Sequence, residues 1–234
     1  MTLQRIVVAA DESDAGRWAV RAALDLAAGT GAEVAVLRAV GVVSRRALAD
    51  TGAVAIADEP PTAPQVEVER LSRWLAPELA GARSGVKVSL AVTYGVPSIE
   101  ICRYAEETRT DLVVLGRKRR SAKTRLLIGD TGDAVARRSP VPCLFVPPGS
   151  GAMRRVLAAL DGTDWGLTVM VTANRLASAA GAELRTVTVE QPVSGETGSA
   201  APPLARTALL QQRVRETLGR DPGARLNVRR GAIV

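Results

Sequence analysis

The sequence predicts an α/β protein with an open parallel sheet, followed by a partial second copy of the same arrangement. Short apolar runs bounded by turn residues, such as residues 5–11 and 111–116, are typical of strands buried on both faces. Helix-like segments stand between these runs, as they do when parallel strands are joined by crossovers. Two separate sequence matches share one offset of 150 residues, which indicates an internal duplication.

The first copy opens with a βαβ unit. Residues 5–11 are predicted to form a buried strand that ends in a carboxylate, Asp11, and Asp14 is a plausible cap for an alanine-rich helix that runs to Ala28. A second strand follows over residues 34–40. The crossover between these two strands is expected to be right-handed.

The middle of the first copy supplies a loop, two helices and a third strand. Residues 41–64 are predicted to be a loop, because their prolines rule out a central strand. Apolar residues at three- and four-residue spacing predict a helix over residues 66–79. Residues 86–93 alternate as a strand does, and Pro97 suits the first turn of a helix over residues 99–108.

The most informative stretch for function covers residues 111–146. A strand ends at Gly116, a cationic loop follows, Gly129 makes a second turn, and a helix begins at Asp130 before a last strand over residues 141–146. Glycine leaves bare backbone that a ligand can approach. A helix N-terminus beside a glycine turn is a ready site for an anion.

At these residues the chain resembles the universal stress protein family. In that family the fourth strand ends in Gly-x-x-Gly, nine residues follow, and Gly-Ser or Gly-Thr opens a helix. The chain keeps this spacing from Gly116 to Gly129, but Arg119 replaces the second glycine and Asp130 replaces the hydroxyl residue. The resemblance implies a Rossmann-like open parallel sheet of strand order 3-2-1-4-5. It also implies a site for ATP or another adenine nucleotide, with Mg²⁺ bound only together with the nucleotide.

The resemblance further implies which residues contact the nucleotide. Asp11 matches the acid that meets the adenine or ribose, and Val40 matches a backbone contact to the base. The alternative for Asp11 is a carboxylate that caps the helix or ties the loop, and Asp130 is likewise a good helix cap without any ligand. The nucleotide-binding residues implied in full are Ala10, Asp11, Val40, Gly116, Arg119, Gly129 and Asp130.

Positive charge is concentrated in one loop. The chain has a net charge of +7, and the loop from Arg117 to Arg125 holds six cations and no acid. Such a cluster attracts phosphate or an acidic protein partner, and the alternative is a solvated loop without a ligand. Nucleic acid is disfavoured as a partner, because no aromatic side chain interleaves these cations for base stacking.

Several function classes are excluded by composition. The chain contains no histidine, which rules out Ser-His-Asp and Cys-His catalysis. The two cysteines, Cys102 and Cys143, are too few for a disulfide framework and are interpreted as small buried apolar residues. Neither a membrane helix nor a signal peptide is predicted, so a cytoplasmic location is expected. We predict no enzymatic activity, although a slow ATPase stays open.

The second copy ends after its third strand. The predicted domains are residues 1–148 and residues 153–234, with Asp161 repeating Asp11 and residues 225–231 repeating the third strand. A connector over residues 190–203 and a helix over residues 204–218 lie between the repeated parts. The first strand of this copy is expected to be the exposed edge of a half sheet. Two interpretations stay open: a truncated tandem protein, or a half domain that leans on a partner.

The leading hypothesis for function is a tandem universal-stress-type regulatory module that senses an adenine nucleotide or another anion with an altered phosphate loop. The alternative is a ligand-free dimerisation or interaction protein of the same fold. Family members pair through the last strand, and the strand from Val141 to Val146 is an apolar edge. We therefore predict a homodimer that pairs through this strand.

Overall fold

The computed structural model describes residues 3–41, 63–82, 85–117, 130–161, 163–190, 212–213, 215–216 and 226–230. The predictions made for Arg119, Gly129 and the rest of the cationic loop after Arg117 lie outside these residues. So do most of the predicted 41–64 loop, the connector after residue 190, and most of the helix predicted over residues 204–218. The chain divides into two compact units, Thr2–Ala152 and Met153–Val234.

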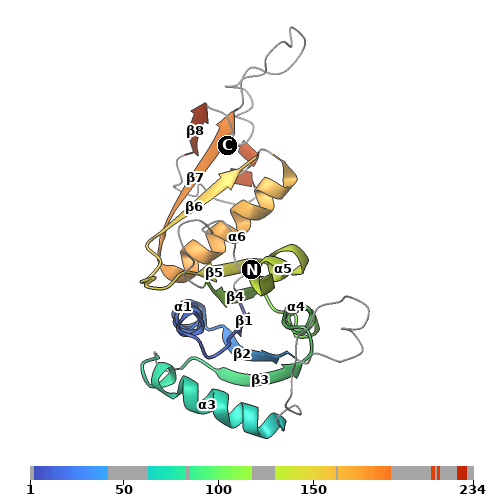
Figure 1. Cartoon of the computed structure of the whole chain (residues 1–234). Helices are drawn as coiled ribbons and strands as arrows, with labels where there is room; N and C mark the ends of the chain where they lie inside the picture. The colour runs from blue at the N-terminus through green and yellow to red at the C-terminus, as the bar shows by residue number, and fades with distance from the viewer. Residues whose placement is uncertain are drawn as a thin grey trace, which may run out of the picture. The chain divides into compact units, whose positions relative to one another are not determined.

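The first unit is built on one five-stranded parallel sheet. The strands lie in the order β3-β2-β1-β4-β5, which confirms the order 3-2-1-4-5 (Figure 1). The central strand β1 has β2 on one side and β4 on the other. The five strands are β1 Arg5–Ala9, β2 Glu33–Val40, β3 Val88–Tyr94, β4 Leu112–Gly116 and β5 Cys143–Val146.

Helices cover both faces of this sheet. Helices α1 and α3 lie on one face, and α4 and α5 lie on the other (Figure 1). The described part of the chain contains no helix with the length and apolarity that a membrane crossing requires. The four helices are α1 Asp14–Thr30, α3 Pro64–Ala80, α4 Pro97–Glu107 and α5 Asp130–Arg138.

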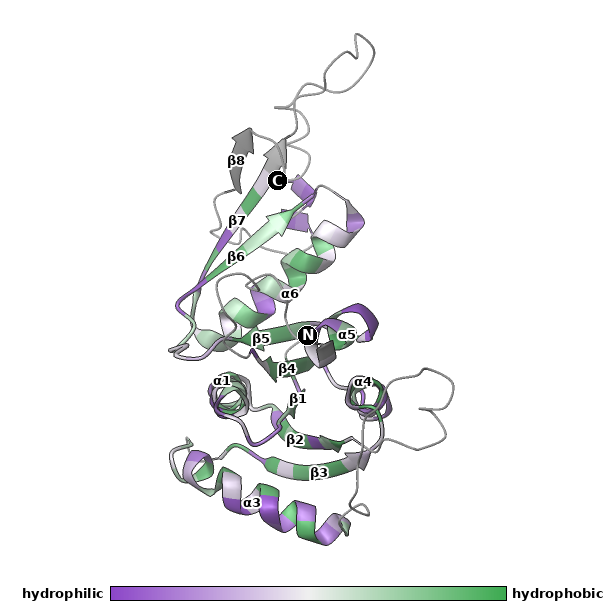
Figure 2. Cartoon of the chain, in the orientation of Figure 1, coloured by the Kyte–Doolittle hydropathy of each residue, from purple (hydrophilic) through white to green (hydrophobic). Residues whose placement is uncertain are grey.

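The core of the first unit is aliphatic and is centred on β1. Ile6 and Val8 are fully buried, and Val7 on the opposite side of the strand is 1% exposed. Val7 packs with Val113 of β4 and Ile101 of α4. Burial on both faces explains why β1 is a continuous apolar run rather than an alternating one, and Figure 2 shows β1 and β4 green for this reason.

Several predicted boundaries differ from the structure by one or two residues, and two of them are the starts of the third and last strands. The third strand begins at Val88, and the last strand begins at Cys143 rather than at Val141. The second shift has a local cause. The hydroxyl of Ser139 donates to the carbonyl of Val141 at 2.7 Å and accepts from its N–H at 3.3 Å, which holds Val141 in a turn before the ladder starts.

The second unit is a three-stranded parallel sheet with one described long helix. Its strands lie in the order β6-β7-β8, so β6 is an edge strand of this sheet, as expected. Ala158 and Leu160 of β6 pack against Met170 and Ala173 of α6 to form a small core. The elements are β6 Arg155–Leu160, α6 Asp164–Ala180, β7 Glu183–Glu190 and β8 Leu226–Arg230.

Matching caps bound the long helices α1 and α6. The hydroxyl of Ser13 accepts from the N–H of Gly16 at the start of α1, and Gly31 ends that helix with φ at 75°. In the second unit Thr163 caps α6 in the same way, and Gly181 ends it with φ at 61°. Both terminal glycines take the left-handed conformation that glycine adopts without steric cost.

Candidate functional site

The carboxyl edge of the first sheet gathers four of the seven predicted site residues. Ala10 and Asp11 follow β1, Val40 ends β2, and Gly116 ends β4. The N–H of Ala10 donates to the carbonyl of Leu37 at 3.0 Å, which keeps this residue beside β2. The order of the strands reverses between β1 and β4, and ligands of open α/β sheets bind in the crevice outside such a point.

The other three predicted residues are placed only in part. Asp130 is the first residue of α5, so its backbone is at a helix N-terminus, but its side chain lies outside the described residues. Arg119 and Gly129 fall in the segment that the structure does not describe. Their contacts to a nucleotide stay predictions.

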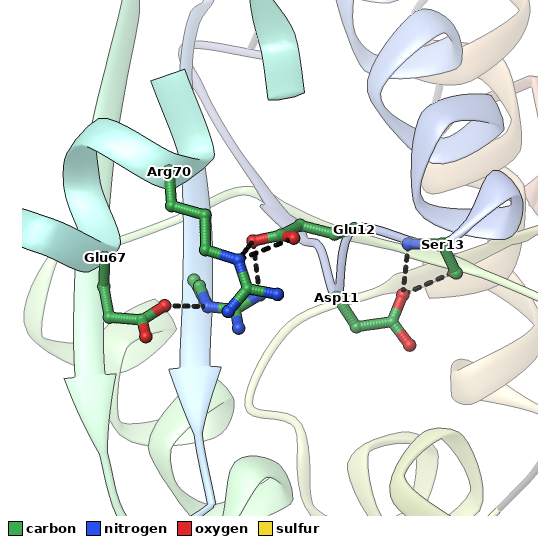
Figure 3. Close-up of polar contacts among 6 residues, drawn as sticks. Asp11, Glu12, Ser13, Glu67 and Arg70 are labelled. Carbon is green, nitrogen blue, oxygen red and sulfur yellow. Dashed lines mark hydrogen bonds and ion pairs between the residues drawn. The ribbon is translucent and has the colours of Figure 1, made fainter. Parts of the chain in front are cut away.

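Asp11 caps the turn that leads into α1. Its Oδ1 accepts from the hydroxyl of Ser13 at 2.5 Å and from the N–H of Ser13 at 3.3 Å. The Ser13 hydroxyl in turn accepts from the N–H of Gly16 at 3.2 Å, and Figure 3 shows the Asp11 carboxylate turned toward Ser13. This is the loop-tying role that the sequence left open as the alternative for Asp11.

The second unit repeats these contacts. Asp161 Oδ1 accepts from the N–H and the hydroxyl of Thr163 at 3.0 and 2.7 Å, and the Thr163 hydroxyl accepts from Gly166 N–H. The hydrogen bond from the Thr163 hydroxyl lowers the pKa of the Asp161 carboxyl. The described part of this unit has no strand that corresponds to β4. Within the described residues the aspartate turn thus forms with no β4-like strand beside it, and its presence alone does not indicate a ligand.

Gly116 has a packing role of its own. A Cβ added at this residue would lie 2.2 Å from the carbonyl oxygen of Ala15. No side chain fits where α1 approaches the end of β4 so closely. A glycine is required here by the fold, whether or not a phosphate also approaches its backbone.

A network of four charged side chains lies beside Asp11. Glu12 Oε2 accepts from Arg70 Nε at 2.9 Å, and Glu12 Oε1 lies 3.0 Å from Arg38 Nη1. Arg38 Nε donates to Glu67 at 2.6 Å. Figure 3 shows Glu12 turned toward α3, away from the side on which Asp11 meets Ser13. The network joins the β1–α1 turn, β2 and α3, and its two acids balance its two bases.

This network bears on the predicted site because of where its members lie in the chain. Glu12 directly follows Asp11, and Arg38 stands two residues before Val40. Glu67 and Arg38 are largely buried, so their ion pair is shielded from solvent. The network therefore fixes the two strand ends that the prediction assigns to the base and the ribose.

The sequence contained a signal for this network. Arg38 is a charged residue inside the otherwise apolar run from Val34 to Val40, and a buried charge requires a partner. Glu12 has φ at 59°, a conformation that costs a residue with a Cβ about 1 kcal/mol or more. The second unit has Gly162 at the matching position of its own turn. A strained acid where the matching turn has a glycine indicates that the acid has specific partners.

A second set of ion pairs joins α1 to α3. The buried carboxylate of Glu78 accepts from Arg21 Nε at 2.5 Å and from Arg17 Nη1 at 3.1 Å. The hydrogen bond from Arg21, followed by that from Arg17, holds the pKa of Glu78 below its usual value. The Arg17 guanidinium also stacks over the ring of Trp74 at 4.8 Å.

Neither metal nor thiol chemistry finds support in this part of the molecule. Over the described ranges, no three His, Cys, Asp or Glu side chains are grouped so that they would hold a metal ion. Cys102 on α4 and Cys143 on β5 are free, partly buried thiols that pack against the core. Burial raises the pKa of both thiols, so neither is an activated nucleophile.

Comparison with known proteins identifies the family. The model of the universal stress protein family matches residues 2–147. A universal stress protein of Methanocaldococcus jannaschii is 28% identical over 143 residues, which cover 61% of this chain and 81% of that protein. The chain belongs to the universal stress protein family.

Solved structures are similar in fold. A universal stress protein from Archaeoglobus fulgidus DSM 4304 matches with a TM-score of 0.66 at 17% identity, over 97% of this chain and 79% of that chain. A universal stress protein in complex with cAMP matches with a TM-score of 0.45 at 25% identity, over 64% of this chain and 100% of that chain. The longer match includes the second unit and shows the fold.

Proposed function

We propose that the first unit is a regulatory module that binds an adenine nucleotide at the carboxyl edge of its sheet. One observation carries the proposal: Ala10, Asp11, Val40 and Gly116 lie at the ends of β1, β2 and β4, around the point where strand order reverses. Membership of the universal stress protein family supports the same site. Binding rather than catalysis is proposed, because the chain has no histidine and its described part assigns no side chain as a general base.

Each residue has a defined part in this proposal. The Asp11 carboxylate accepts from the ribose or the adenine amine, and the Val40 backbone contacts the base. The phosphates lie toward Gly116 and the N-terminus of α5, where backbone N–H groups favour an anion. Asp130 repels a triphosphate unless Mg²⁺ lies between them, so we propose that binding of ATP requires Mg²⁺.

The direct test is the ligand content of the purified chain. The protein is denatured and the released small molecules are analysed, and titration calorimetry then measures ATP, ADP and AMP with and without Mg²⁺. We expect an adenine nucleotide whose affinity rises with Mg²⁺ and rises again in Asp130→Ser. Tight ATP binding without Mg²⁺ would contradict the part given to Asp130.

A pair of matched variants tests the location of the site. Asp11→Asn keeps the oxygen that accepts from Ser13 but removes the negative charge, so the turn is retained. Because hydrogen bonds to charged groups contribute roughly 1.5 to 3 kcal/mol, we expect nucleotide affinity to fall about tenfold. Asp161→Asn makes the same change in the second unit and is expected to leave affinity unchanged. Equal effects of the two variants would place the ligand elsewhere.

A second candidate function is a ligand-free interaction protein of the same fold. Two observations favour it: Asp11 has the capping contacts that Asp161 repeats, and Gly116 is required by its approach to Ala15. Neither residue then needs a nucleotide to explain it. Release of no nucleotide, together with no heat on titration with ATP and Mg²⁺, would favour this function over the first.

Assembly, charge and location are proposals of the same kind. Among the described strands β5 pairs only with β4 and forms the outer strand of the sheet, so we propose a homodimer through residues 141–146. Light scattering at micromolar concentration tests it, and a monomer would contradict it.

For the loop from Arg117 to Arg125 we propose a phosphate or acidic protein ligand whose binding weakens with salt. A cytoplasmic location completes the proposal.

A further inference from the structure

The outer edge of β6 carries backbone groups that point away from the sheet. The carbonyl of Arg154 accepts from Glu183 N–H at 3.0 Å, so Arg154 directs its backbone groups toward β7. Successive residues of a strand alternate in this direction. Arg155, Leu157 and Ala159 therefore direct their N–H and C=O groups toward the outer edge.

The first unit shows what this edge is built to pair with. The carbonyl of Arg5, which corresponds to Arg155, accepts from the N–H of Asp111 at 2.9 Å, at the start of β4. Ile6 and Val8 have Leu112 and Val114 as neighbours in that parallel pair. In the first unit the same edge thus receives a parallel strand.

Large apolar side chains border the β6 edge. Leu157 on β6 is 65% exposed, and Trp165 and Val169, one turn apart on α6, are 78% and 45% exposed. Their counterparts in the first unit, Val7, Ala15 and Ala19, are all buried. Val7 is covered by β4 and the helices beyond it, and Ala15 contacts the end of β4 at Gly116. The three exposed residues therefore mark the surface that β4 and its helices cover in the first unit.

We propose that this surface, namely the β6 edge with Leu157, Trp165 and Val169, binds an extended apolar segment of a partner polypeptide as a parallel fourth strand. Main-chain hydrogen bonds to an open sheet edge supply affinity in this mode of recognition. The segment must be apolar on both sides. One side faces the flank of α6, and the other lies next to Leu157, as Leu112–Leu115 of β4 are buried on both faces in the first unit.

A second copy of the β6 edge does not fit as the occupant. Two β6 strands paired side by side lie about 4.8 Å apart. Each carries α6 packed directly on it through Ala158 and Leu160, and packed helices need about 8 to 10 Å between their axes. The helices would collide. A segment that brings no helix of its own to that face avoids the collision, which commits the site to a single strand.

The probe is a peptide with the sequence of residues 111–117, Asp-Leu-Val-Val-Leu-Gly-Arg, added to the full chain. Amide hydrogen exchange is followed residue by residue. We expect exchange at Leu157 and Ala159 to slow by about tenfold or more, because their N–H groups become bonded. The N–H groups of Ala158 and Leu160 point toward β7, so their exchange rates are expected to change little. The Trp165 fluorescence is expected to shift to shorter wavelength as its ring leaves water.

The controls distinguish strand addition from nonspecific binding of the peptide. A peptide of the same composition in scrambled order is expected to give no protection. Leu157→Lys is expected to abolish the effect, because a charged residue on an edge opposes pairing. Ile99→Lys changes another exposed apolar residue, on α4 of the first unit, and is expected to leave the protection by the peptide unchanged.

Three results would overturn the proposal. One is protection spread evenly over odd and even residues of β6, which would indicate that the whole second unit becomes more stable. Another is no protection at Leu157 and Ala159 when the peptide is in large excess. The last is protection of the same two amides without peptide as protein concentration rises, which would make a second copy the occupant.

Discussion

The turns that follow β1 and β6 are built alike, yet the strands that lead into them differ in burial. Asp11 with Ser13 and Asp161 with Thr163 make the same hydrogen bonds. Val7 is buried among β4, α4 and α5, whereas Leu157 at the corresponding position is open to solvent. The comparison separates local structure, namely a turn and its helix cap, from the burial of a strand in the sheet. A turn and its helix cap need about six consecutive residues, but burial of a central strand needs elements that arrive much later in the chain.

The largest expected effect comes from placing the same charge at the two corresponding positions. Val7→Lys buries an ammonium without a partner, and we expect the first unit to lose about 4 kcal/mol of its free energy of unfolding. Leu157→Lys leaves its charge in water and is expected to change stability by less than about 0.5 kcal/mol. Denaturant unfolding followed by hydrogen exchange in each unit measures both. A large loss from Leu157→Lys would show that β6 is covered in solution.

A smaller expected effect is a difference between the two units in how their stability depends on pH. The folded pKa of Glu78 is lowered by Arg21 and Arg17, so this pairing stabilises the first unit above the ordinary glutamate pKa of about 4.3. The stabilisation is lost as pH falls from there through the lowered folded value. We expect Glu78→Gln to cost about 2 kcal/mol at pH 7 and to flatten that acid-side loss.

The second unit provides the control for this pH dependence. The positions that correspond to Arg17 and Arg21 are Leu167 and Val171 on α6, which carry no charge. Glu78→Gln is therefore expected to leave the acid stability of the second unit unchanged. A parallel change in both units would mean that the pH response does not arise between α1 and α3.

The smallest expected effect comes from a substitution in the turn after β1 that makes it more like the turn after β6. Glu12→Gly gives the first unit the residue found at position 162. Removal of the positive-φ strain returns about 1 kcal/mol, while loss of the ion pairs to Arg38 and Arg70 costs about 2 kcal/mol. We expect a net loss of about 1 kcal/mol by denaturant unfolding. A gain in stability would show that the network contributes less than the strain that it maintains.

Much of the fold was predictable from the sequence. Runs of aliphatic residues marked β1 and β4, because burial of a strand on both faces leaves a local signal in the sequence. The last strand was predicted two residues too long, since the bonds between Ser139 and Val141 form a turn that apolar content does not reveal.

The site was less predictable, for a physical reason. The ends of β1, β2 and β4 were expected at one edge, and they lie there. The charged network was not expected, because Glu12 and Arg70 are 58 residues apart and meet only once α3 is placed against the sheet. The roles of Asp11 as a cap and of Gly116 as a packing residue also required coordinates, because each depends on a neighbour at a particular distance.

The place of β1 in the sheet also has a consequence for how the chain folds as it is synthesised. β1 and β2 are available early, but Leu112, the β4 neighbour of Ile6, follows about 100 residues later. At roughly 5 to 20 residues per second, the ribosome takes roughly 5 to 20 s to supply it. During that interval the nascent β1 has an open edge like that of β6 in the described three-stranded sheet. Val7 is then an exposed apolar residue that a chaperone can bind. Chaperone binding to ribosome-bound chains is therefore expected to fall sharply once β4 has emerged.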